Sequence, residues 1–127
     1  MRSSVTLINT TKATLPRVAF DAIKDAALGT EYELTIAIVP PAEIRKLNLQ
    51  YRNIDKATDI LSFPLSENEG EIYISPQDTR REAPKFDRSY DNFFAFIFVH
   101  GCTHLKGHDH GAIMEGVETK ILEKFNI

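Results

Sequence analysis

Apolar residues in the chain recur with two different periods, which predict a mixture of strands and helices. Residues 4–9 are rich in β-branched and apolar types, and residues 32–39 alternate apolar with polar positions, so both segments are predicted strands. Apolar residues recur at helical spacing over residues 16–29, and a further helix is predicted from about residue 41 to residue 50. The apolar positions of the helix at 16–29 are Val18, Ala19, Ala22, Ile23, Ala26 and Ala27.

The second half of the chain begins with a different pattern. Residues 58–64 and 67–75 are two short apolar segments joined by a polar, glycine-containing turn, which predicts a β-hairpin. Residues 76–89 are polar and contain two prolines, so a loop or a short helical turn is expected. A closing helix is predicted over residues 114–125. Because strands and helices alternate first and a hairpin follows, we predict an α+β domain in which helices cover a mixed sheet.

Composition and charge narrow the class of protein. The 127 residues are enough for one domain, and we expect a single domain over residues 1–127. A net charge of −3 argues against a globally basic nucleic-acid-binding surface, so a polyanion would have to bind a local patch. No apolar segment is long enough to span a bilayer, and the first residues do not resemble a signal peptide. The single cysteine, Cys102, fits a reducing compartment, and we expect a cytoplasmic protein without a membrane partner.

All four histidines of the chain lie between residues 100 and 110, immediately after the apolar segment 93–99. That segment alone fits either a buried strand or a buried helix. On a strand His100 and His104 would stand ~13 Å apart, which is too far for one metal ion. On a helix the same pair lies on one face with Cβ atoms ~6 Å apart, a spacing that suits two zinc ligands. A metal site therefore predicts a helix here.

The residues that follow the helix bring further ligands toward the same ion. Gly107 is expected to turn the chain in the left-handed region and to end the helix, so that His110 can fold back. Three histidine ligands leave the fourth position of zinc open, as in catalytic sites. In the H-E-x-x-H pattern of zinc proteases the residue after the first histidine is a glutamate, but here it is Gly101. Protease chemistry is therefore disfavoured.

Two blocks of sequence resemble one known family. The stretch HGCTHLKGHDH, at residues 100–110, is similar to the signature of the YbeY family of bacterial single-strand-specific endoribonucleases. The stretches LNLQYRNIDKATDILSFP, at residues 47–64, and GEIYIS, at residues 70–75, resemble the upstream pattern of the same family. The resemblance implies a small α+β fold with a sheet of about four strands and one zinc ion per chain, bound by three histidines beside a cleft.

The third metal ligand has two candidates. The family usually has a tyrosine before its Asp-His pair, whereas this chain has His108 at that position. His110 has the family spacing if the chain turns at Gly107, and only a helix continued through Gly107 would bring His108 to the face of the other two histidines. Asp109 has two interpretations, either as a second-shell acceptor that orients a ligand imidazole or as a cap of the turn.

The resemblance also indicates residues that act on RNA. Arg52 matches the functional arginine of the family, and its planar guanidinium suits phosphate oxygens. We expect Arg52 and His100 to be catalytic residues, with His100, His104 and His110 as metal ligands. Basic residues in segments that flank the expected cleft are candidates for guiding an RNA backbone. These residues are Lys56, Arg80, Arg81, Lys85 and Arg88.

The function implied by the resemblance is that of a zinc-dependent endoribonuclease, a hydrolase of phosphodiester bonds. Its expected partners are single-stranded RNA, ribosomal RNA and the small ribosomal subunit, with roles in maturing the 3′ end of small-subunit ribosomal RNA and in ribosome quality control. The alternatives are a ribosome-assembly protein with a structural zinc ion and a zinc hydrolase of another substrate class. Whether water or the 2′-hydroxyl of the substrate is the nucleophile stays open.

Overall fold

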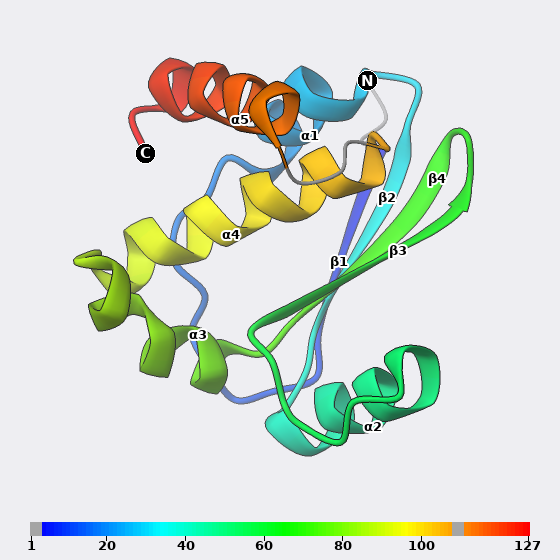
Figure 1. Ribbon diagram of the computed structural model, residues 1–127, viewed down its shortest axis with the longest axis vertical. Coiled ribbons are helices and arrows are strands. Elements are labelled where there is room, and N and C mark those ends of the chain that lie inside the picture. Colours follow the sequence, from blue (N-terminus) through cyan, green and yellow to red (C-terminus); the bar gives the residue numbers. More distant parts are fainter. Residues whose placement is uncertain (1–3, 108–110) are drawn as a thin grey trace.

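The fold is built on a mixed sheet, seen in the computed structural model, which describes residues 4–107 and 111–127. Within these ranges the sheet has four strands in the order β1-β2-β4-β3. β1 pairs in parallel with β2, β2 pairs in parallel with β4, and β3 is antiparallel to β4 (Figure 1). The strands are β1 (Val5–Asn9), β2 (Glu33–Ile38), β3 (Ile60–Ser66) and β4 (Glu69–Ile74). The predicted α+β class, the mixed sheet and the hairpin are confirmed.

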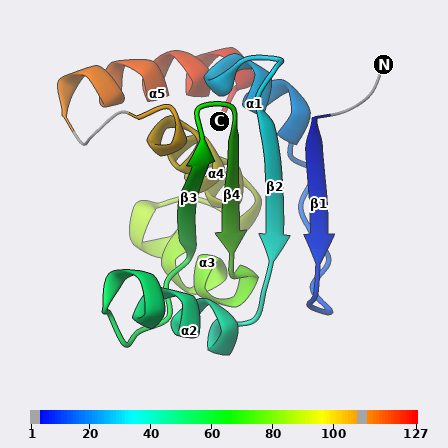
Figure 2. The same ribbon diagram turned by 90° about the vertical axis from the view of Figure 1, so that its right-hand side faces the viewer.

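Helices lie on both faces of this sheet but unequally. One side is covered by α1 (Phe20–Leu28), α3 (Pro76–Glu82), α4 (Tyr90–Leu105) and α5 (Ala112–Phe125). On the other side, α2 (Pro41–Arg52) is the one helix among the described residues, and it lies near one end of the strands (Figure 2). A short 3-10 helix, η1 (Ala83–Phe86), joins α3 to α4. Across the two described ranges, every helix is too short or too polar to cross a bilayer.

The predicted histidine-bearing helix is α4, and its sequence explains both of its ends. The Ser89 hydroxyl caps the first turn by accepting a hydrogen bond from the backbone N–H of Asn92, at 3.1 Å. The helix contacts the sheet, α1 and α5, and it ends before Gly107, whose φ of +94° is the left-handed conformation that glycine favours. Four phenylalanines supply its apolar surface, and all but the half-buried Phe96 are buried: Phe93, Phe94, Phe96 and Phe98.

The first helix differs from its prediction. α1 begins at Phe20 rather than at residue 16, because the N–H of Phe20 bonds to the carbonyl of Val18 at 2.8 Å in a tight turn that helical geometry does not contain. The predicted apolar positions Ala22 and Ala26 are exposed, and Lys24 is fully buried instead. Its ammonium donates to carbonyls at the C-terminal end of the helix and beyond, those of Gly29 (3.1 Å), Thr30 (3.4 Å) and Tyr32 (3.0 Å). Burial of this lysine could not be predicted from apolar spacing.

The segment 76–89 is more regular than a loop. It forms α3, which begins with Pro76 after the N-cap Ser75, and the Ser75 hydroxyl accepts a hydrogen bond from the N–H of Asp78 at 3.4 Å. The Thr79 hydroxyl donates to the Ser75 carbonyl at 2.7 Å. Pro76 is compatible with the first turn of α3, and Pro84 lies in η1, so the segment is helical where a loop or a short helical turn was expected.

Gly101 sets how closely α4 approaches the sheet. A Cβ atom at this position would lie 2.8 Å from Ile60 Cδ1 and 3.0 Å from the Ser62 hydroxyl, both on β3. We therefore expect Gly101→Ala to lower the free energy of unfolding by about 1–3 kcal/mol through overpacking, although alanine has the higher helix propensity. Urea unfolding followed by circular dichroism measures the change.

The matched control for Gly101→Ala is Gly116→Ala on α5. Gly116 is exposed, an added Cβ would meet no atom within 4 Å, and its φ is not positive. Replacing it should raise the stability by about 0.5–1 kcal/mol through helix propensity alone. A Gly101→Ala protein as stable as the wild type would contradict the close contact between α4 and β3.

Candidate functional site

Two histidines one turn apart on α4 converge on one point. The Nε2 atoms of His100 and His104 lie 3.1 Å from each other. The two rings are nearly perpendicular, with an interplanar angle of 84° and centroids 4.6 Å apart. Both side chains are half-buried, so their ε nitrogens remain within reach of solvent and of a ligand. The i, i+4 placement predicted from the sequence is confirmed.

This geometry fits a pair of zinc ligands. A tetrahedral zinc ion with Zn–N bonds of ~2.0–2.1 Å holds two nitrogen ligands ~3.3 Å apart, close to the separation of the two Nε2 atoms. Three residues of the prediction, His108, Asp109 and His110, lie outside the described residues. Among the residues that are described, no three His, Cys, Asp or Glu side chains are grouped so that they could hold a metal ion.

A carboxylate of α5 contacts the first histidine, and sequence reasoning missed it. Glu118 Oε1 lies within hydrogen-bond distance of His100 Nδ1. The one proton of the Thr103 hydroxyl is shared between the His100 carbonyl, at 2.8 Å, and the same carboxylate oxygen, at 3.2 Å. Glu118 has four-residue spacing from buried Met114 and three-residue spacing from buried Ile121. A carboxylate on the apolar stripe of the closing helix was the signal that could have revealed it.

The glycine between the two histidines has a packing role. Because Gly101 has no side chain, the backbone of α4 comes close enough to β3 for the Ser62 hydroxyl to donate to the Gly101 carbonyl at 3.3 Å. A glutamate here, as in the protease pattern, would collide with Ile60 and Ser62. The absence of that glutamate therefore follows from how the helix packs.

A cleft of about 480 Å³ opens beside the histidines. One wall is α4 and the other is the edge strand β3, and Arg52, the last residue of α2, completes the lining. The remaining lining residues are Ile60, Leu61, Ser62, Pro64, Gly101 and Leu105. Arg52 is exposed, and among the described residues it makes no hydrogen bond or ion pair. The structure thus brings Arg52 and the two histidines to one cleft.

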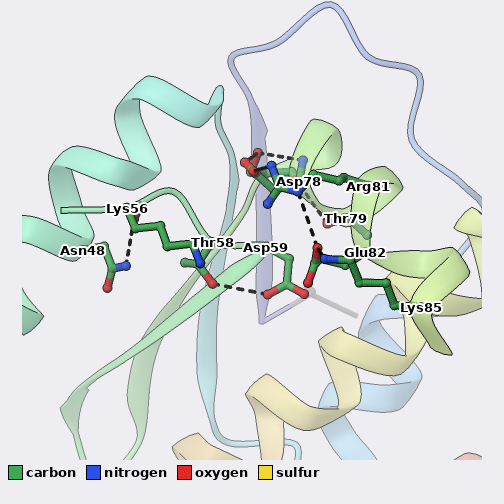
Figure 3. A network of polar contacts seen from close by, with 10 residues as sticks. Asn48, Lys56, Thr58, Asp59, Asp78, Thr79, Arg81, Glu82 and Lys85 are labelled. Carbon is green, nitrogen blue, oxygen red and sulfur yellow. Dashed lines mark hydrogen bonds and ion pairs between the residues drawn. The ribbon is translucent and has the colours of Figure 1, made fainter. Parts of the chain in front are cut away.

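A second cleft of about 420 Å³ shares Arg52 with the first. It lies between α2, the segment that follows it, and α3, and its walls include Lys56, Arg81 and Lys85 (Figure 3). Arg81 pairs with Asp78 at 2.6 Å, and Lys85 pairs with Glu82 at 2.7 Å. Its basic side chains are therefore partly neutralised.

Asp59 is one of the two acidic residues, with Glu82, that line this second cleft. Burial raises the pKa of its carboxyl group above the ordinary value, and the nearby charge of Glu82 raises it further. A backbone hydrogen bond from Ile60 opposes that rise. The pKa of Glu82 is lowered instead, chiefly by its hydrogen bond from Lys85. The second cleft is thus lined by both basic and acidic side chains.

The other two basic candidates lie away from these clefts. The Arg80 guanidinium stacks over the Tyr90 ring, 4.0 Å from its centroid, and lines a cavity with residues 14–17. The Arg88 guanidinium lies 4.2 Å from the centroid of the Phe96 ring. Neither arginine lines the first or the second cleft. Of the five basic candidates, Lys56, Arg81 and Lys85 are brought together and Arg80 and Arg88 are not.

Cys102 does not line the first or the second cleft. Its side chain is fully buried in the main core, and burial raises the pKa of its thiol. A protonated thiol in an apolar core is neither a nucleophile nor a metal ligand.

Comparisons of the sequence with known proteins identify a single family. A family model described as endoribonuclease YbeY matches residues 3–126. A relative from Pelotomaculum thermopropionicum named endoribonuclease YbeY is 34% identical over 129 residues, covering 89% of this chain and 85% of the relative. One of the same name from Nautilia profundicola is 37% identical over 107 residues, covering 79% of this chain and 77% of the relative. The solution structure of TM1509 from Thermotoga maritima shares the fold, with a TM-score of 0.65 at 24% identity, covering 95% of this chain and 88% of that one.

Proposed function

The chain belongs to the endoribonuclease YbeY family, and from this premise we propose that it is a zinc-dependent endoribonuclease that cleaves single-stranded RNA. The observation that carries the proposal is the convergence of the His100 and His104 Nε2 atoms, 3.1 Å apart, in a cleft that Arg52 also lines. This arrangement combines a pair suited to metal binding with a group suited to phosphate binding, and both would stabilise negative charge on a phosphate during cleavage.

We propose that His100, His104 and His110 hold one zinc ion per chain, with Asp109 orienting a ligand imidazole. When bound, zinc would polarise a phosphoryl oxygen and lower the pKa of a bound water toward ~7. The histidines contribute neutral nitrogen ligands and leave one position open for substrate. The part of His100 in catalysis is to hold that centre at the wall of the cleft.

Arg52 is the residue that we propose to bind the substrate phosphate. Its guanidinium is always protonated and presents a planar set of donors that matches two phosphate oxygens. Because no described residue neutralises it, its donors are available to a ligand at the mouth of the cleft. It would place the scissile phosphate against the histidine wall and offset the negative charge that develops during cleavage.

Arg52 lines both clefts, and from this we infer the path of the RNA strand beyond Arg52. We propose that Lys56, Arg81 and Lys85 contact the sugar–phosphate backbone along the second cleft, which Arg52 connects to the first. Arg80 and Arg88 would serve only a longer substrate, because they lie outside both clefts. Since the net charge is −3, binding would depend on this local group of cations.

The biological substrate that we propose is ribosomal RNA on the small ribosomal subunit. The proposed roles are maturation of its 3′ end and ribosome quality control, in the cytoplasm. The support is the resemblance of residues 47–64, 70–75 and 100–110 to the family pattern, together with family membership. The single buried thiol of Cys102 fits a reducing compartment.

The function is tested by assaying the zinc-loaded protein on three labelled substrates of one sequence: single-stranded RNA, duplex RNA and single-stranded DNA. We expect cleavage of the single-stranded RNA, its loss after chelation and its return when zinc is added back. The end groups of the products distinguish attack by water from attack by the 2′-hydroxyl. Cleavage that persists after complete removal of metal would overturn the metal-dependent mechanism, and absence of RNA cleavage in loaded protein would overturn the nuclease assignment.

A further inference from the structure

We propose that Glu118 is a positioning residue that fixes the tautomer and the orientation of the His100 ring. This inference rests on the proposed function, in which His100 is a metal ligand. The contact joins α5 to α4, two helices that lie side by side (Figure 1). A residue of the closing helix would thus act on the site through His100 of the central helix. Glu118 itself does not line the cleft.

The hydrogen-bond pattern determines where the His100 proton lies. Because an ionised carboxylate only accepts hydrogen bonds, the contact with Glu118 requires a proton on His100 Nδ1. In the neutral ring Nε2 is then the unprotonated nitrogen, and this is the atom that faces His104 Nε2 at 3.1 Å. The carboxylate thus selects the tautomer that can bind a metal ion through Nε2.

Thr103 holds the carboxylate in place. Its side chain is fully buried one turn along α4 from His100, and its hydroxyl lies 3.2 Å from Glu118 Oε1. Among the described residues, the polar contacts of the Glu118 side chain are those with His100 and Thr103. Restrained from two sides, the carboxylate also restrains rotation of the imidazole.

Burial of the Glu118 carboxylate costs free energy unless a neighbouring group stabilises its charge. Its side chain is only 14% exposed and no lysine or arginine pairs with it within the described ranges. Transfer of a carboxylate from water into the protein is unfavourable when no cation pairs with it. An apolar side chain, such as those of Met114 and Ile121 on the same face of α5, would pack between the helices equally well. A negative charge directed at Nδ1 makes the opposite nitrogen a stronger ligand, which is the use that the geometry indicates.

The test compares Glu118→Gln, which keeps the shape, and Glu118→Ala with the matched control Glu115→Gln. Glu115 is exposed on the same helix, its carboxylate makes no hydrogen bond or ion pair with the described residues, and its replacement changes the net charge equally. Two quantities are measured: the zinc dissociation constant by competition with a chromophoric chelator, and the His100 tautomer in metal-free protein from imidazole ¹⁵N shifts. We expect both Glu118 variants to bind zinc about 10- to 100-fold more weakly, with Glu115→Gln unchanged.

The tautomer measurement separates this inference from the proposed function. Metal-free wild type should have the His100 proton on Nδ1, and the Glu118→Ala protein should lose that preference, whether or not the protein cleaves RNA. Unchanged tautomer and zinc affinity in both variants would overturn the positioning role. Loss of helical circular dichroism in both metal-free variants would also overturn it, because Glu118 would then be required for folding.

Discussion

His104→Ala is expected to abolish high-affinity zinc binding and to reduce RNA cleavage by roughly 10³-fold or more. The Nε2 atom of His104 is one of two nitrogens, 3.1 Å apart, that we propose as zinc ligands, so its removal leaves one proposed ligand on α4. Electrostatic stabilisation of phosphoryl oxygens by a metal ion amounts to several kcal/mol, and each 1.36 kcal/mol corresponds to a tenfold change in rate.

The fold should survive this change. His104 is half-buried near the end of α4, and alanine is a strong helix former, so metal-free stability should change little. Zinc content, cleavage of single-stranded RNA and thermal unfolding without metal are measured on the same samples. Retention of zinc at the wild-type level would refute the ligand role. Loss of zinc with full activity would show that the metal is not catalytic.

A comparison of His110→Ala with His108→Ala extends the same measurement to the third ligand. Because α4 ends at Leu105 and Gly107 has the left-handed conformation typical of a helix end, we expect His110 rather than His108 to be the third ligand. The larger loss of zinc affinity should therefore follow replacement of His110. Equal losses in a zinc titration would show that the chain beyond Gly107 uses both histidines.

The parts of the site that were predicted from the sequence are those fixed by local periodicity. Four-residue spacing places His100 and His104 on one face of a helix, wherever that helix lies in the fold. Gly107 follows the end of this helix because glycine readily adopts the left-handed φ found there. The prediction that residues 93–99 are helical depended on this spacing, since their apolar character alone fits either structure. The local spacing therefore predicted both the helix and the face on which its two histidines lie.

The parts that were missed depend on contacts between elements distant in sequence. Glu118 reaches His100 only because α5 packs on α4, and Gly101 is required because of where β3 lies. Burial of Lys24 likewise depends on the carbonyl groups that surround it in the fold. Periodicity assigns residues to faces, but it does not identify the partner of each face, so these roles appear only in the assembled structure.

The second large effect is expected from replacement of Arg52. Arg52→Ala should lower cleavage of single-stranded RNA by roughly 10- to 1000-fold, because charge-assisted contacts to a phosphate contribute ~1.5–4 kcal/mol to the transition state. Its position favours this role, since Arg52 ends α2 beside the left-handed cap residue Asn53 and lines both clefts. The melting temperature should scarcely change, because Arg52 is exposed and unpaired among the described residues.

Two further variants make the Arg52 measurement specific. Arg52→Lys keeps the charge but loses the planar set of donors, so its activity should be well below that of the wild type and above that of Arg52→Ala. Arg45→Ala is the matched control, because Arg45 is an exposed arginine on the same helix, paired with Asp55 at 2.7 Å and outside both clefts. Wild-type activity in Arg52→Ala would remove the phosphate role, and equal losses in Arg45→Ala would point to a general effect of surface charge. If Arg52→Ala loses activity and thermal stability together, while its zinc content is unchanged, the residue supports the end of α2 rather than the substrate.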